Sequence, residues 1–294
     1  MAKKKVYLHY DQEGLDAQYN LRARWPRHPE FFAQWRREGD AVRARADCRR
    51  DLAYGPTPAE TLDLLPPAAL AAGGRAPLLV FIHGGYWQAL DKRDVCFLAP
   101  PFAKAGVAFA APNYALAPQV GLDEIVRQMR AALAWLWRNA PGLGCDPRRI
   151  YVAGHSAGGH LAAMLAATNW SRHGGLPSDL IKGAFSVSGV YDLEPLKLSY
   201  QNAVLKLDDG AARRNSPQGL AANRATPVWA TVGGEESEEF HRQQAALAKA
   251  WRAAGGVVRE IAAPKLHHFD ILAKCADFAH PIGKAMRAMM DAGI

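Results

Sequence analysis

Apolar and polar positions along the chain follow two periods, one typical of strands and the other typical of helices. Residues 78–82 and 107–111 are continuous apolar runs, as expected for strands that are buried on both faces of a sheet. Residues 122–139 instead carry apolar side chains at helical spacing, so they predict an amphipathic helix. The middle of the chain therefore predicts strands that alternate with helices.

The same alternation continues on both sides of this region. Two short strand candidates, 48–53 and 61–65, bracket a turn that contains glycine and proline, and they predict an antiparallel hairpin. A helix is expected at 95–105, although Pro100 and Pro101 should delay or interrupt it. Further strands are expected at 149–153, 182–190, 228–232 and 257–262, and further helices at 159–167, at 237–254 and at the end of the chain. The prediction is an α/β fold with a mostly parallel central sheet, helices on both faces and an antiparallel N-terminal hairpin.

The length of the chain indicates one large domain. It has 294 residues, 49% of them hydrophobic, and no long linker divides it, so we expect a single domain over residues 1–294. Residues 1–47 are predicted to form an N-terminal helical extension, because aromatic side chains recur along one apolar face. Residues 193–222 are polar and irregular, and they predict a lid-like insertion over the site.

Composition and charge narrow the classes of function. The formal net charge is +8, but basic residues are interleaved with acidic ones, so no nucleic-acid partner is expected. No apolar run approaches the length of a membrane span, and no secretory signal is recognisable near the start, so no membrane partner is expected. The four cysteines are scattered without metal-ligand spacing, which fits reduced thiols and a cytoplasmic location. The sequence is compatible with a homodimer.

A glycine-containing turn between a predicted strand and a predicted helix carries the strongest chemical signal. Residues 154–158 read Gly-His-Ser-Ala-Gly, with strand 149–153 before them and helix 159–167 after them. Glycine at both flanks lets the two backbones pass closely, and the tight turn lifts the hydroxyl of Ser156 clear of the sheet. Ser156 is therefore the predicted nucleophile. The alternative is a helix-entry turn whose glycines serve packing alone.

A second glycine motif, His-Gly-Gly-Tyr-Trp at residues 83–87, directly follows the predicted strand 78–82. Consecutive glycines at the carboxyl end of a strand let backbone N–H groups point toward a bound oxygen. We expect Gly84, Gly85 and Ala157 to supply the N–H groups of an oxyanion hole. The alternative is a plain glycine turn.

The base and the acid of a catalytic triad are expected further along the chain. His268 lies in Leu-His-His-Phe-Asp, after the last predicted strand, and is favoured over His267 as the base that accepts the serine proton. The chain order serine, acid, histidine is the order that this architecture uses. Glu236 is the preferred acid, Glu235 is the second choice, and Asp192 is the third.

Four motifs together resemble one family. HGGYW, GHSAGG, ESEEFHRQ and HHFD are similar to those of the α/β-hydrolase-type kynurenine formamidases (arylformamidases) and, more loosely, to those of hormone-sensitive-lipase-like esterases. The resemblance covers about residues 48–290 and implies the α/β-hydrolase fold. It also implies the roles of nucleophile for Ser156, base for His268 and acid for Glu236. A glutamate stands where formamidases often have aspartate, so the choice between Glu235 and Glu236 stays open.

The function implied by this resemblance is hydrolysis of an aryl formamide, N-formylkynurenine to kynurenine and formate, through a formyl-serine intermediate. The expected partner is a small-molecule substrate, and the mechanism requires no metal or organic cofactor. Tyr86 and Trp87 are candidate substrate contacts, and core packing is the equal alternative for Trp87. The first alternative function is a general short-acyl carboxylesterase, which would use the same triad. The second is a non-catalytic hydrolase-fold binding protein, whose usual mark would be loss of Ser156 or His268.

Overall fold

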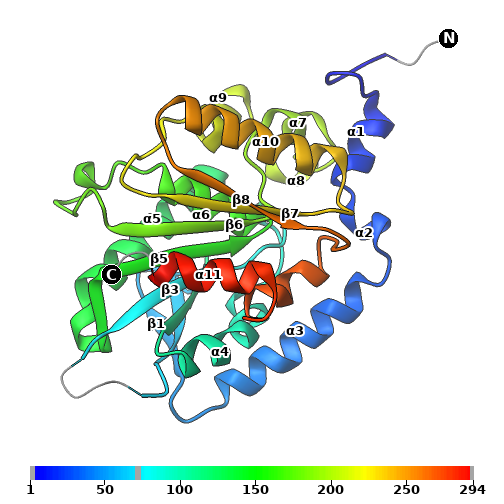
Figure 1. The fold of residues 1–294 in the computed structure, drawn as a ribbon. Helices are drawn as coiled ribbons and strands as arrows, with labels where there is room; N and C mark the ends of the chain where they lie inside the picture. Colours follow the sequence, from blue (N-terminus) through cyan, green and yellow to red (C-terminus); the bar gives the residue numbers. More distant parts are fainter. Residues whose placement is uncertain (1–3, 70–73, 292–294) are drawn as a thin grey trace.

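The computed structural model describes residues 4–69 and 74–291. At its centre lies one eight-stranded sheet with the strand order β1-β2-β4-β3-β5-β6-β7-β8 (Figure 1). The strands are β1 (Arg49–Ala53), β2 (Thr61–Leu65), β3 (Ala76–Ile82), β4 (Ala108–Pro112), β5 (Cys145–His155), β6 (Ile181–Val187), β7 (Val228–Gly233) and β8 (Val258–Ala263). The predicted α/β fold class is confirmed.

The direction of the strands also agrees with the prediction. β1 pairs antiparallel with β2, and β2 pairs antiparallel with β4. All other neighbours, from β4 through β3 to β8, are parallel. Every residue of β3 is buried, since layers of helices cover both faces of the sheet there. This explains why the sequence of β3 is an unbroken apolar run.

The helices form a layer on each face of the sheet (Figure 1). α5, α6 and α10 contact the strands from one side, and α4 and α11 contact them from the other. The helices are α1 (Gln12–Tyr19), α2 (Leu21–Arg24), α3 (His28–Arg43), α4 (Ala99–Lys104), α5 (Leu122–Asn139), α6 (Ala157–Ala166), α7 (Glu194–Leu198), α8 (Asn202–Leu205), α9 (Asp209–Arg214), α10 (Glu238–Ala253) and α11 (Pro281–Asp291). Short 3-10 turns lie at η1 (Lys92–Asp94), η2 (Cys96–Leu98), η3 (Ala140–Leu143), η4 (Trp170–Arg172), η5 (Pro217–Gly219) and η6 (Asp270–Cys275).

Three local predictions need correction. The expected helix at 95–105 is divided into η2 and α4, because proline fits in the first turn of a helix, where no N–H partner is lost. β6 ends at Val187 and not at residue 190, because Ser188 has a φ of 51°, which a strand does not allow. The insertion 193–222 is less irregular than predicted, since α7, α8 and α9 lie within it.

The described part of the predicted extension, residues 4–47, forms α1, α2 and α3 and is called the N-terminal segment below. In Figure 1 it runs in blue along one edge of the molecule. The hydroxyl of Tyr19 donates a hydrogen bond to Glu239 at 2.8 Å, and the hydroxyl of Ser237 donates one to the carbonyl of Gln18 at 2.8 Å. These bonds tie the segment to the start of α10.

Two further findings concern the whole described chain. Within residues 4–69 and 74–291, no helix is both long enough and apolar enough to cross a bilayer. The four cysteines are free thiols, and three of them are buried.

Candidate active site

Ser156 lies in the sharp turn between β5 and α6. Its backbone has φ 57° and ψ −118°, and its N–H donates a hydrogen bond to the carbonyl of Val187 at 2.8 Å. A Cβ at Gly154 would overlap the carbonyl of Gly158, and a Cβ at Gly158 would overlap the carbonyl of Ile82. Both flanking positions therefore require glycine, and the strained turn at Ser156 is held from two sides.

His268 and Glu236 are in direct contact in the buried interior of the site. Nδ1 of His268 lies 2.6 Å from Oε2 of Glu236, and both side chains are almost fully buried. An ionised carboxylate can only accept, so Nδ1 donates, and Nε2 is the ring nitrogen that remains to accept a proton. The other oxygen of Glu236 accepts from the N–H of Gly233 at 2.9 Å and from the hydroxyl of Ser188.

The two other candidate acids lie elsewhere. Glu235 is exposed to solvent. Asp192 accepts a hydrogen bond from the hydroxyl of Tyr7 at 3.0 Å and lies 3.4 Å from Arg242. Of the three candidates, only Glu236 contacts His268.

Three residues of the sequence motifs, His155, Phe240 and Phe269, contact His268. Nε2 of His155 donates to the main-chain carbonyl of His268 at 2.8 Å, and burial lowers the pKa of His155 well below its usual value. His155 is therefore neutral and acts as a fixed donor. The ring of Phe269 stands perpendicular to that of His268, with centroids 5.4 Å apart, and Phe240 contacts the same ring at 5.0 Å. His267 stacks on Trp25 instead and does not line the pocket.

The predicted oxyanion donors gather around Ser156. Gly84 lies so close that a Cβ there would be 3.2 Å from the Cβ of Ser156, and Gly85 has a φ of 99° that favours glycine. Among the described residues, no backbone acceptor pairs with the N–H of Gly84 or Gly85. Ala157 is the first residue of α6, so its N–H has no acceptor within the helix. The N–H groups of Gly84, Gly85 and Ala157 thus have no backbone partner among the described residues, as the predicted role of oxyanion donors requires.

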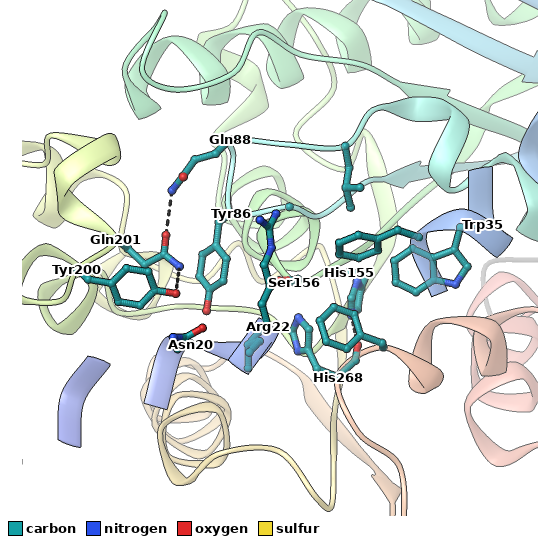
Figure 2. Close-up of a pocket in the computed structure, with 15 residues that line it drawn as sticks. Asn20, Arg22, Trp35, Tyr86, Gln88, His155, Ser156, Tyr200, Gln201 and His268 are labelled. Atoms are coloured by element: carbon teal, nitrogen blue, oxygen red, sulfur yellow. Dashed lines mark hydrogen bonds between the residues drawn. The ribbon is translucent and has the colours of Figure 1, made fainter. Parts of the chain in front are cut away.

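A pocket of about 230 Å³ opens over Ser156 and His268 (Figure 2). Its lining falls into two parts that flank the serine. The apolar part consists of Leu21, Phe32, Trp35, Leu90 and Phe269, and the polar part consists of Asn20, Arg22, Tyr86, Gln88, Tyr200 and Gln201, while Gly85 and His155 complete the wall. The pocket can therefore hold a ligand with an aromatic portion and a polar or charged portion.

The two candidate substrate contacts occupy different environments. Tyr86 lines the pocket, and its hydroxyl donates to the carbonyl of Tyr19 at 2.8 Å. Trp87 is fully buried, does not line the pocket, and packs edge-on against His160 with ring centroids 4.9 Å apart. Trp87 thus takes the core-packing alternative, in which its side chain packs against His160 of α6.

Sequence reasoning missed the parts of the pocket that come from the N-terminal segment and from the insertion. The N-terminal segment supplies Asn20, Arg22, Phe32 and Trp35, and the insertion supplies Tyr200 and Gln201. The aromatic face of α3 was recognisable in the sequence, and an apolar helix face predicts packing against another part of the molecule. The signal did not say that it covers a pocket.

The site contains no evident metal centre. Within the described ranges, no group of three or more His, Cys, Asp or Glu side chains is arranged to hold an ion. The remaining buried histidines make structural contacts. Nε2 of His160 donates to the carbonyl of Asn215 at 2.7 Å, and His83 stacks on Tyr114 with ring centroids 4.2 Å apart.

Comparisons with known proteins show which proteins this chain is similar to. A family model described as BD-FAE matches residues 62–197. The chain is 34% identical to the kynurenine formamidase of Danio rerio, over 82% of this chain and 81% of that protein. It is 33% identical to the kynurenine formamidase of Salmo salar, over 85% of each protein. A solved structure from Silicibacter sp. tm1040 is 29% identical and has a TM-score of 0.80, covering 94% of this chain and 98% of that chain.

Proposed function

Since the chain belongs to the kynurenine formamidase family, we propose that it hydrolyses an aryl formamide, N-formylkynurenine, to kynurenine and formate. The chain is a hydrolase, and its substrate is a small molecule. The observation that carries the assignment of residues is the 2.6 Å contact between His268 and Glu236 beside a pocket that also contains Ser156.

The first half of the proposed reaction forms an acyl-enzyme. His268 accepts the proton of the Ser156 hydroxyl at Nε2, and the oxygen attacks the formyl carbon. Glu236, held by Gly233 and Ser188, orients the ring and stabilises the imidazolium that forms.

The oxyanion is the next species to be stabilised. The N–H groups of Gly84, Gly85 and Ala157 would donate to it, and each such donor is worth about 10²–10³ in rate. When the C–N bond breaks, the imidazolium of His268 gives its proton to the departing aniline nitrogen. The product amine leaves, and the formyl group remains on Ser156.

The second half releases formate. Water gives a proton to His268 and attacks the formyl carbon, and the same N–H groups stabilise the second oxyanion. The bond to Ser156 breaks, the serine oxygen recovers a proton from His268, and formate is released. Every proton that moves passes through one nitrogen, Nε2 of His268.

The decisive experiment compares two substrates with the purified chain. We expect a much larger kcat/KM for N-formylkynurenine than for p-nitrophenyl acetate, with formate and kynurenine formed in equal amounts. A far larger kcat/KM for the ester would favour the alternative, a general short-acyl carboxylesterase.

A serine-directed probe tests the nucleophile separately. A fluorophosphonate should label the chain at Ser156, and Ser156→Ala should abolish labelling and lower kcat by about 10⁴–10⁶-fold. Ser171, an exposed serine outside the pocket, gives the matched control Ser171→Ala. Near-normal turnover by Ser156→Ala would refute the mechanism.

The cytoplasmic location, the homodimer and the absence of a nucleic-acid partner stay predictions, as do the single domain and its lid-like insertion.

A further inference from the structure

One cation stands at the polar part of the pocket. Of the 15 residues that line it, Arg22 is the only one with a permanent charge, and none of the 15 is an Asp or Glu. Arg22, Ser156 and His268 line the same pocket (Figure 2). The pocket lining therefore carries a positive charge, on the exposed residue Arg22, that no lining carboxylate neutralises.

Arg22 also differs from other arginines of the N-terminal segment. Arg27, Arg36 and Arg43 each pair with a carboxylate. Within the described residues, Arg22 forms no salt bridge and no side-chain hydrogen bond, and Arg24 packs its guanidinium over the ring of Trp25. The planar donor groups of Arg22 are thus available to a ligand.

The backbone around Arg22 is held firmly. Leu21 is buried, and Asn20 caps α2 by accepting a hydrogen bond from the N–H of Ala23 at 3.2 Å. The carbonyl of Tyr19 accepts a hydrogen bond from the hydroxyl of Tyr86, which directly follows Gly84 and Gly85 in the chain. Because the segment is anchored at Tyr19 and Leu21, Arg22 is presented at a fixed place relative to the pocket.

The surroundings of Arg22 suit the polar end of a ligand. Gln88 donates to Gln201 at 2.9 Å, and Gln201 donates to the hydroxyl of Tyr200 at 2.9 Å (Figure 2). Burial raises the pKa of Tyr200, and the charge of Arg22 partly offsets this rise, so the two groups lie within electrostatic reach. Amide and hydroxyl groups next to a guanidinium form a typical setting for a carboxylate with a polar neighbour.

We propose that Arg22 binds the carboxylate of the substrate's side chain, so that this site selects aryl formamides whose leaving group carries an anion. The inference rests on the proposed function, because N-formylkynurenine bears an α-amino acid at the end of its ketone side chain. The guanidinium would donate two parallel hydrogen bonds to this carboxylate. The same contact is made in the bound substrate and in the transition state, so it lowers KM and leaves kcat almost unchanged.

The test measures binding and turnover with two ligands, N-formylkynurenine and its decarboxylated analogue, in which hydrogen replaces the carboxylate. In the Ser156→Ala chain, which does not turn the ligand over, Arg22→Gln should raise the Kd for N-formylkynurenine about 5- to 20-fold, an effect reduced by exposure of Arg22. The Kd for the analogue should change less than twofold. In the chain with Ser156, Arg22→Gln should raise KM for N-formylkynurenine by a similar factor at constant kcat.

Two further variants separate a specific contact from a structural effect. Arg22→Lys keeps the charge without the planar donor pair and should recover part of the loss. Arg24→Gln, on the same helix but outside the pocket, should leave both Kd values unchanged. The proposal is overturned if Arg22→Gln weakens both ligands equally, weakens neither, or if the Ser156→Ala chain does not bind N-formylkynurenine at all.

The proposed function fails in a different way. It fails if the unmodified chain hydrolyses neither formamide, which is a turnover result. The assignment of Arg22 is judged by the ratio of the two Kd values in a chain that performs no chemistry, so the two outcomes are read separately.

Discussion

The ring of His155 donates a hydrogen bond to the main-chain carbonyl of His268 at 2.8 Å. His155 precedes the nucleophile directly, and His268 comes from a loop 113 residues further along the chain. The bond therefore joins the turn of the serine to the loop of the base, and it fixes one relative to the other.

Loss of this bond should affect catalysis more than folding. His155→Phe keeps an aromatic ring but removes the donor, so the His268 loop should shift and kcat should fall about 10- to 100-fold. The free energy of unfolding should fall by about 1–3 kcal/mol, because a buried carbonyl loses its partner. Steady-state kinetics and urea denaturation measure the two effects. Full kcat in His155→Phe would show that His268 is positioned by other contacts.

The contact between Glu236 and His268 predicts which acid matters. Glu236→Gln removes the charge that stabilises the imidazolium and disturbs the tautomer of His268, so kcat should fall about 10³- to 10⁴-fold. Glu235→Gln, one residue away but exposed, should stay within twofold of the unmodified chain. Equal losses in the two variants would contradict the assignment of Glu236.

The close approach of β5, α6 and β3 predicts that Gly158 cannot be replaced. A Cβ at Gly158 overlaps the carbonyl of Ile82, so Gly158→Ala should lower the free energy of unfolding by about 1–3 kcal/mol and displace Ser156. Thermal melting and fluorophosphonate labelling report the two effects. Gly142 faces open space, so Gly142→Ala is the matched control and should change neither. A stable, fully labelled Gly158→Ala chain would mean that the turn can relax.

Buried histidines predict that stability falls in mild acid. Burial lowers the pKa of His160 to about 4, whereas a histidine in the unfolded chain has a pKa of about 6.5. Between these values the unfolded chain takes up a proton and the folded chain does not, so the free energy of unfolding falls as pH falls. From pH 7.5 to pH 5, His160 alone should account for about 2 kcal/mol. Above about pH 7.5, where the ring is neutral in both the folded and the unfolded chain, its contribution is constant.

The measurement is urea denaturation at the two pH values. His160→Gln, which keeps a donor for the carbonyl of Asn215, should lose about 2 kcal/mol less than the unmodified chain over this interval. An unchanged pH dependence in His160→Gln would show that the buried ring is protonated in the folded chain.

Local patterns in the sequence predicted most of the fold. The amphipathic helix at 122–139 was correct to the residue, and the hairpin at 48–53 and 61–65 is present as β1 and β2. These elements are encoded by spacing and turn residues within a short window. The prolines at 100 and 101 were noted as an interruption, but their effect depends on where the helix begins, which only packing decides.

The candidate site was predictable only as far as its motifs reach. Ser156, His268 and Glu236 were named, because nucleophile, base and acid follow strand ends in a fixed chain order. Arg22 and Tyr200 were not named. Each lies on a short helix or turn with no motif of its own, and its place in the pocket depends on how distant segments dock. Such docking is a property of the assembled molecule and not of any local pattern.

The attachment of the N-terminal segment to α10 has a consequence for folding during synthesis. The hydrogen bond from Ser237 to Gln18 joins residues that are 219 positions apart in the chain. Gln18 is therefore synthesised long before Ser237, and this contact forms only late in translation. Until Phe269 is made, Phe31 and Phe32 of α3 lack the ring against which they pack in the folded chain. The polar and aromatic walls of the pocket are complete only when nearly the whole chain has left the ribosome. The pocket that selects the substrate is therefore completed after most of the central sheet has been synthesised.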